Sequence, residues 1–129
     1  MFKADSVFSG FSVGDIEAAK QFYGEKLGLE VEDIPGMGMQ LKLPGGGTVF
    51  VYHKPDHSPA SFTILNFVVV NIDAAVDELV SEGVVFEQYD NEQMHQDEKG
   101  IARGREAGMG PDIAWFKDPA GNILSVLQN

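Results

Sequence analysis

The sequence contains no cysteine, few basic residues and no long apolar run. Without cysteine the chain forms no disulfide bonds and carries out no thiol chemistry, which favours a reducing compartment. No stretch approaches the roughly 18 consecutive apolar residues that a membrane-spanning helix needs. The first residues carry no apolar run typical of a signal peptide. We therefore expect a cytoplasmic protein that does not enter a membrane.

Positive charge is scarce in this chain. Nine Lys and Arg residues stand against 20 Asp and Glu residues, which gives a formal net charge of −11. A field of this sign repels phosphate backbones and anionic lipids, so we expect no nucleic-acid partner. Solubility alone can also explain the excess of acidic residues. The length of 129 residues fits one domain that buries its own core.

Two segments of the chain resemble each other. Residues 11–32 read FSVGDIEAAKQFYGEKLGLEVE and residues 67–87 read FVVVNIDAAVDELVSEGVVFE, and they align with one single-residue gap. In each copy an apolar strand ends at Asp15 or Asn71, residue types that cap a helix N-terminus. Apolar residues then recur at helical spacing. Each copy therefore predicts a strand followed by a helix.

Glycine ends both predicted helices. Gly28 and Gly83 occupy matching positions, and glycine adopts the left-handed conformation that stops a helix at little steric cost. A second strand is expected after each glycine, over residues 29–34 and 84–89.

The remaining part of each copy is also shared. Residues 41–53 (LKLPGGGTVFVYH) and residues 116–128 (FKDPAGNILSVLQ) each read as a strand, a turn with Pro and Gly, and a strand. We therefore predict an α+β fold, one domain of two tandem βαβββ modules at about residues 1–54 and 62–129. The Pro- and Ser-rich residues 55–61 form the linker. Residues 90–111 are polar and Gly-rich, as in lids, binding loops and mobile segments.

The segments FSVGDIEAAKQFYGEKLGL, FVVVNIDAAVDEL and FKDPAGNILSVLQ, in this order, resemble the vicinal-oxygen-chelate superfamily of glyoxalases, bleomycin-resistance proteins and extradiol dioxygenases. The resemblance covers nearly the whole chain. It implies that each module curves its sheet into half a cup with its helix on the convex side, and that paired modules enclose a pocket. Because each module leaves strand edges to be covered, we expect a homodimer. Pairing within one chain or between two chains remains open.

The resemblance also indicates where metal ligands would stand. Superfamily enzymes hold a divalent metal with His, Glu or Gln on the first and last strands of each module. The matching positions here are Phe8, Phe50, Ile64 and Ser125. Phenylalanine and isoleucine have no lone pairs, and a neutral hydroxyl is a poor ligand for a divalent cation. We therefore expect no metal and no cofactor.

Strand alternation predicts which side chains face the cup. On the last hairpin, either Trp115 or Phe116 points inward, because the register is open. The side chains either fill the cup as core or line a pocket for a small, partly aromatic ligand. The pocket hypothesis names Phe8, Gly10, Ser12, Thr48, Phe50, Tyr52, Ile64, Asn66, Trp115 and Ser125.

Five further polar residues invite a functional interpretation. Arg103 and Arg105 are possible contacts for an anionic group of a ligand, or else surface ion pairs. His53 and His57 have a spacing that suits zinc on a helix, but the prolines around His57 exclude a regular helix. His95 lies in an acidic loop segment that reads as solvated.

Three classes of function follow. The first is a metal-free protein that binds an amphipathic or aromatic molecule, as in the bleomycin-resistance branch. The second is a lyase, isomerase or dioxygenase with a non-standard site, whose catalytic residues the sequence does not identify. The third is a non-catalytic module that associates with another protein. The aromatic cup and the missing ligands favour the first class.

Overall fold

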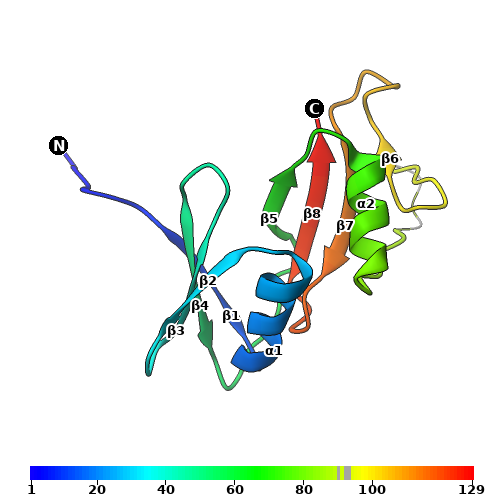
Figure 1. The fold of residues 1–129 in the computed structure, drawn as a ribbon. Coiled ribbons are helices and arrows are strands. Elements are labelled where there is room, and N and C mark those ends of the chain that lie inside the picture. Colours follow the sequence, from blue (N-terminus) through cyan, green and yellow to red (C-terminus); the bar gives the residue numbers. More distant parts are fainter. Residues whose placement is uncertain (90, 92–93) are drawn as a thin grey trace. The chain divides into compact units, whose positions relative to one another are not determined.

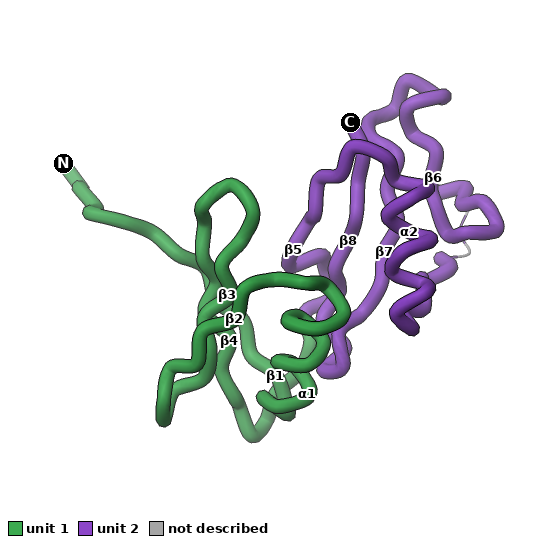
Figure 2. The backbone as a smooth tube through the Cα atoms, viewed as in Figure 1, with its two compact units in different colours: residues 1–59 green, residues 60–129 purple. Residues whose placement is uncertain are grey.

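The chain divides into two compact units, residues 1–59 and residues 60–129, shown in green and purple in Figure 2. The computed structural model describes residues 1–89, 91 and 94–129. Each unit contains one four-stranded sheet and its own helix (Figure 1). The units are described separately below.

The first unit has six elements. Its sheet has the order β1-β4-β3-β2, with β1 parallel to β4 and the other neighbours antiparallel. Tyr23 of the helical segment is fully buried against the sheet, and its ring centroid lies 5.7 Å from that of Phe11. The elements are β1 (Ser9–Val13), α1 (Ile16–Lys20), the π-helical segment η1 (Gln21–Lys26), β2 (Glu30–Ile34), β3 (Gly38–Lys42) and β4 (Thr48–His53).

The second unit repeats this arrangement. Its sheet has the order β5-β8-β7-β6, again with the first and last strands parallel, and α2 lies over β7 and β8 (Figure 1). The predicted α+β fold of two similar modules is therefore confirmed. The elements are β5 (Thr63–Val68), α2 (Ile72–Ser81), β6 (Ala102–Arg103), β7 (Asp112–Lys117) and β8 (Ile123–Gln128).

Both helices begin at the predicted caps. The Asp15 carboxylate accepts a hydrogen bond from the backbone N–H of Ala18 at 3.1 Å, and the Asn71 side chain accepts one from Ala74 at 3.0 Å. Each bond satisfies one of the donors that a helix leaves free at its first turn.

In the described part of the chain, no helix is long and apolar enough to cross a membrane.

The two helices differ in length by one residue, which explains the gap in the alignment of the copies. The first helix changes after Lys20 into η1, where hydrogen bonds span five residues instead of four. The wider turn takes up the extra residue, so the helix still ends at Gly28, which has φ of +71°. Gly83, with φ of +92°, ends α2 in the same way.

The strand predicted over residues 84–89 does not form a continuous ladder. Phe86 makes an isolated bridge to Phe116, and β6 pairs with the far end of β7 instead. The side chain of Gln96 explains the break, because it accepts a 2.6 Å hydrogen bond from the backbone of Tyr89 and donates one of 3.0 Å to the carbonyl of Glu87. These backbone groups are satisfied without a strand partner.

Candidate functional site: the uncovered faces of the two sheets

Burial alternates along β3, β4 and β7, which separates, in each sheet, a face covered by the unit's helix from the opposite face, called the uncovered face here. In the first unit Val13, Val49 and Val51 are almost fully buried against the helix side. Their neighbours Ser12 and Tyr52 are only partly buried and therefore belong to the other face.

The uncovered face of the first unit carries an aromatic pair and a polar pair. The rings of Phe50 and Tyr52 stack with centroids 5.7 Å apart and an interplanar angle of 18°. Across the β1–β4 ladder, Gly10 lies opposite Phe50 and Ser12 lies opposite Tyr52. Ser12 Oγ lies 2.7 Å from Nδ1 of His57. The face thus joins apolar surface to a hydrogen-bonding group.

His57 belongs to the predicted linker, and its contact with Ser12 is not predicted from the sequence. The sequence Lys54-Pro55-Asp56-His57, with proline at its second position, predicts a turn but not the direction in which it leads. The backbone N–H of His57 donates to the Lys54 carbonyl at 3.0 Å, and Lys54 N donates to Val13 O at 3.1 Å. Both bonds bring the chain back over the end of β1.

The uncovered face of the second unit is a row across three strands. Asn66 lies opposite Ser125, and Trp115 lies opposite Ser125 on its other side. Ser125 is fully buried, and its Oγ donates a 2.6 Å hydrogen bond to Asn66 Oδ1. Phe116 is fully buried on the helix side with Leu124, so Trp115 is the residue of the pair that belongs to the uncovered face.

The ring of Tyr89 extends this row. Its centroid lies 5.5 Å from that of Trp115 in an edge-to-face arrangement, a favourable geometry for two aromatic rings. Burial, with the nearby carboxylate of Glu87, raises the pKa of the Tyr89 phenol. The Tyr89 hydroxyl can donate or accept a hydrogen bond.

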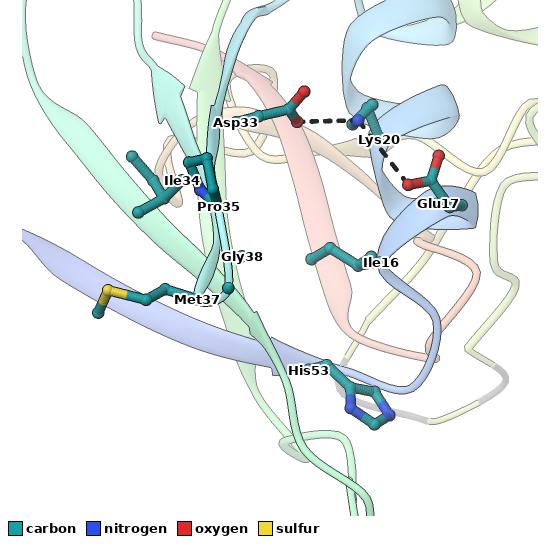
Figure 3. A pocket seen from close by; sticks show the side chains of 10 residues that line it. Ile16, Glu17, Lys20, Asp33, Ile34, Pro35, Met37, Gly38 and His53 are labelled. Carbon is teal, nitrogen blue, oxygen red and sulfur yellow. Dashed lines mark ion pairs between the residues drawn. The ribbon is translucent and has the colours of Figure 1, made fainter.

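A separate pocket of about 600 Å³ opens elsewhere in the first unit, between the start of α1 and the turn after β2 (Figure 3). Its polar part is the ion pair of Lys20 with Asp33, at 2.8 Å, with Glu17 3.8 Å from Lys20. His53 lies at its edge. None of the residues predicted to line the ligand pocket takes part in it.

The family model of the Glyoxalase/Bleomycin resistance protein/Dioxygenase superfamily matches residues 6–126. The chain belongs to this superfamily. The resemblance seen in the sequence motifs is thereby confirmed. No curated protein sequence matches the chain.

Solved structures agree with this membership. The antibiotic binding protein TnmS3 from Streptomyces sp. CB03234 has 25% sequence identity, 98% coverage of both chains and a TM-score of 0.62. A glyoxalase family protein from Enterococcus faecalis has 22% identity, covers 98% of this chain and 99% of its own, and has a TM-score of 0.65. An integron cassette protein from the mobile metagenome of Halifax Harbour sewage outfall has 21% identity, covers 98% and 100%, and has a TM-score of 0.68.

The metal-ligand positions of the superfamily do not fit a metal in this chain. Phe8 precedes β1 and is 64% exposed, and Phe50 stacks on Tyr52. A bulge in β5 leaves Ile64 without a paired residue on β8. Ser125 has the one side-chain oxygen among these four residues, and its hydroxyl donates a hydrogen bond to Asn66. Across residues 1–89, 91 and 94–129, no three His, Cys, Asp or Glu side chains gather as a metal site.

The two arginines considered as ligand contacts lie among acids of their own unit. Arg103 donates two hydrogen bonds to Asp73, at 2.8 and 3.0 Å, and a third to Asp97 at 3.1 Å. The bond from Arg103, helped by Lys99, lowers the pKa of Asp73 to about 2. Arg105 lies 3.7 Å from the buried Asp112.

The long polar segment is better packed than its composition indicates. Ile101 is fully buried, and Asp97 accepts hydrogen bonds from the backbones of Lys99 and Ile101 at 2.9 Å each. Residues 97–103 are therefore held by a buried side chain and by hydrogen bonds to their backbone. Arg103 also ties this segment to the first turn of α2 through Asp73.

Proposed function

We propose that this superfamily member binds a small amphipathic or aromatic molecule on the uncovered faces of its sheets, without a metal. The observation that carries the proposal is the set of partly exposed aromatic side chains on these faces, Phe50 with Tyr52 and Trp115 with Tyr89. A planar apolar ligand gains both burial and ring stacking from such a surface.

The polar groups beside these rings support an amphipathic ligand. The face of the first unit carries the Ser12–His57 pair beside its rings, and the face of the second unit carries the Tyr89 hydroxyl. A few hydrogen-bonding groups on a mostly apolar surface are the usual composition of small-molecule sites. The net charge of −11 favours a cationic ligand over an anionic one. TnmS3, which shares the fold across nearly its whole length, is an antibiotic binding protein.

Fluorescence of Trp115 tests the proposal, because this is the one tryptophan of the chain. A series of small aromatic compounds, each in a cationic and a neutral form, is titrated against the protein, and calorimetry verifies every change in emission. We expect saturable quenching, stronger for the cationic member of a pair and weaker at high salt. Absence of binding by both methods across the series rejects the proposal.

A matched variant separates ligand binding from non-specific quenching. Tyr52→Leu removes the stacked ring of the first unit but leaves Trp115 and its surroundings in the second unit unchanged. Reduced affinity in this variant shows that the face of the first unit contributes to binding. Unchanged affinity confines the ligand to the face that carries Trp115.

Association of two copies is the second part of the proposal. β1 and β5 are edge strands of their sheets, as β2 and β6 are at the opposite edges, and each has a neighbour on one side only. Exposed apolar side chains lie on or beside β1 and β5: Val7 at 91%, Phe62 at 68% and Val70 at 93%. Uncovered strand edges with apolar side chains favour pairing with another chain, so we propose a homodimer.

A further inference from the structure

Two serines of the uncovered faces make short hydrogen bonds, but their partners differ chemically. Ser125 donates to the side-chain oxygen of Asn66 at 2.6 Å, and an amide oxygen does not accept a proton near neutral pH. Ser12 lies 2.7 Å from Nδ1 of His57. In the tautomer with its proton on Nε2, this nitrogen accepts the Ser12 hydroxyl proton. Ser12 is thus paired with a base and Ser125 is not.

The Ser12–His57 pair is held by backbone bonds rather than by a flexible contact. His57 N donates to Lys54 O and Lys54 N donates to Val13 O, the residue after Ser12. Pro55 fixes φ at the second position of this turn, which lowers the entropy that the turn loses on folding. Both side chains are partly exposed, so a small molecule can reach them.

Surface for a substrate lies beside Ser12. Gly10 lies on the same face of β1, two residues before Ser12, and adds no side chain to this face; a Cβ there would lie 3.2 Å from the carbonyl oxygen of Phe50. Across the ladder, the stacked rings of Phe50 and Tyr52 offer a flat apolar surface. An aryl group on these rings places an attached acyl group near the Ser12 hydroxyl.

We propose that Ser12 is a nucleophile, with His57 as its general base, toward small activated acyl compounds such as aryl esters. Ser12 Oγ attacks the acyl carbon while its proton moves to His57 Nδ1. The aryl–oxygen leaving group departs with that proton, and an acyl ester remains on Ser12. Water, deprotonated by His57, then hydrolyses this ester, releases the carboxylic acid and restores the serine. This proposal does not depend on the metal-free ligand of the previous subsection.

The experiment uses p-nitrophenyl acetate on the full chain. We expect a burst of nitrophenol release, and peptide mapping by mass spectrometry that finds the acetyl group on Ser12. Mapping of the unmodified sequence needs no variant, so it decides the proposal even if a substitution disturbs folding. Acetyl groups only on lysines or on other serines overturn it.

Substitutions then test the role of the base. Ser12→Ala abolishes acetylation at this position, and His57→Gln slows it on the order of a hundredfold, because glutamine keeps a hydrogen-bond acceptor but takes no proton. Ser81→Ala is the matched control, since its hydroxyl donates to the Glu78 carbonyl on α2 at 2.6 Å. An unchanged rate with His57→Gln overturns the assignment of the base.

Discussion

Ser125 on β8 donates its hydroxyl proton to Asn66 on the parallel strand β5, with 2.6 Å between the oxygens. Ser125 is fully buried and Asn66 is exposed. The two groups that share this hydrogen bond therefore differ in their access to water. If the bond is removed, Asn66 can turn to water, but the Ser125 hydroxyl cannot.

This asymmetry predicts the order of two substitutions. Asn66→Ala leaves a buried hydroxyl without its partner and lowers the free energy of unfolding by about 1–3 kcal/mol. Ser125→Ala removes the buried hydroxyl itself and changes this free energy by roughly 1 kcal/mol or less. Urea unfolding of both single variants and of the double variant measures the coupling. Equal losses in both single variants contradict this view of the pair.

A large residue at Ser125 tests the proposed binding face. Ser125→Phe forces a ring between Asn66 and Trp115, with an overpacking cost of about 1–3 kcal/mol. We also expect weaker binding of any compound that quenches Trp115. Ser125→Ala is the size control and keeps the affinity within about threefold, less than one neutral hydrogen bond is worth. Full affinity in the Phe variant places the ligand away from Ser125.

The purified protein is expected to hold no stoichiometric divalent metal. Phe8, Phe50 and Ile64 offer no donor atoms, and the Ser125 hydroxyl is a weak one. Elemental analysis of protein prepared without chelator measures the content. One zinc, iron, nickel or manganese ion per chain disproves this prediction, whichever residues bind it.

Light scattering checks the proposed homodimer. We expect a mass of twice the 14.0 kDa chain at micromolar concentration. Val70→Lys places a charge beside β5, at a side chain that is 93% exposed, and is expected to shift the protein toward monomer. Val80→Lys, on the exposed side of α2 at 53%, is the matched control and leaves the dimer intact. A wild-type mass of one chain rules out the dimer.

Asp73 makes stability depend on pH in the acid range. Its pKa falls from the ordinary value of 3.8 to about 2 in the folded chain, chiefly through the hydrogen bond from Arg103. The unfolded chain therefore binds this proton first as the pH falls. The contribution of Asp73 is complete above pH 3.8 and is lost as the pH falls to about 2.

The size of this effect is limited by solvent, because the Asp73 side chain is 48% exposed. Asp73→Asn should lower the free energy of unfolding at pH 7 by at most about 1 kcal/mol and flatten its decline between pH 4 and pH 2. Asp5→Asn removes an exposed carboxylate of the other unit and serves as the control. Identical pH profiles for the wild type and Asp73→Asn contradict the role of this ion pair.

Local signals explain what the sequence predicts well. Asp15, Asn71, Gly28 and Gly83 act on residues within one helical turn, so their types alone indicate where each helix begins and ends. The repetition of the pattern also identifies the two modules, because the same order of elements occurs twice.

Contacts between distant residues explain what the sequence does not predict. Ser12 and His57 are 45 residues apart, and their contact depends on a turn whose direction only the folded strand decides. The β7–β8 register decides that Trp115, and not Phe116, lies on the uncovered face. The side chain of Gln96 forms the hydrogen bonds to the backbone of Tyr89 and Glu87 that a neighbouring strand would otherwise form. Strand propensities do not predict such a contact.

The π-helical segment η1 shows how a duplicated unit tolerates a change in length. One residue more stands between the cap and the terminal glycine in the first unit than in the second, yet both helices begin at a side-chain cap and end at a glycine with positive φ. An insertion that would rotate everything after it by about 100° in a regular helix is confined to one widened turn. Removal of Gly24, inside that turn, is therefore expected to yield an ordinary α-helix and an unchanged sheet, so this position is a natural one at which to lengthen or shorten the protein.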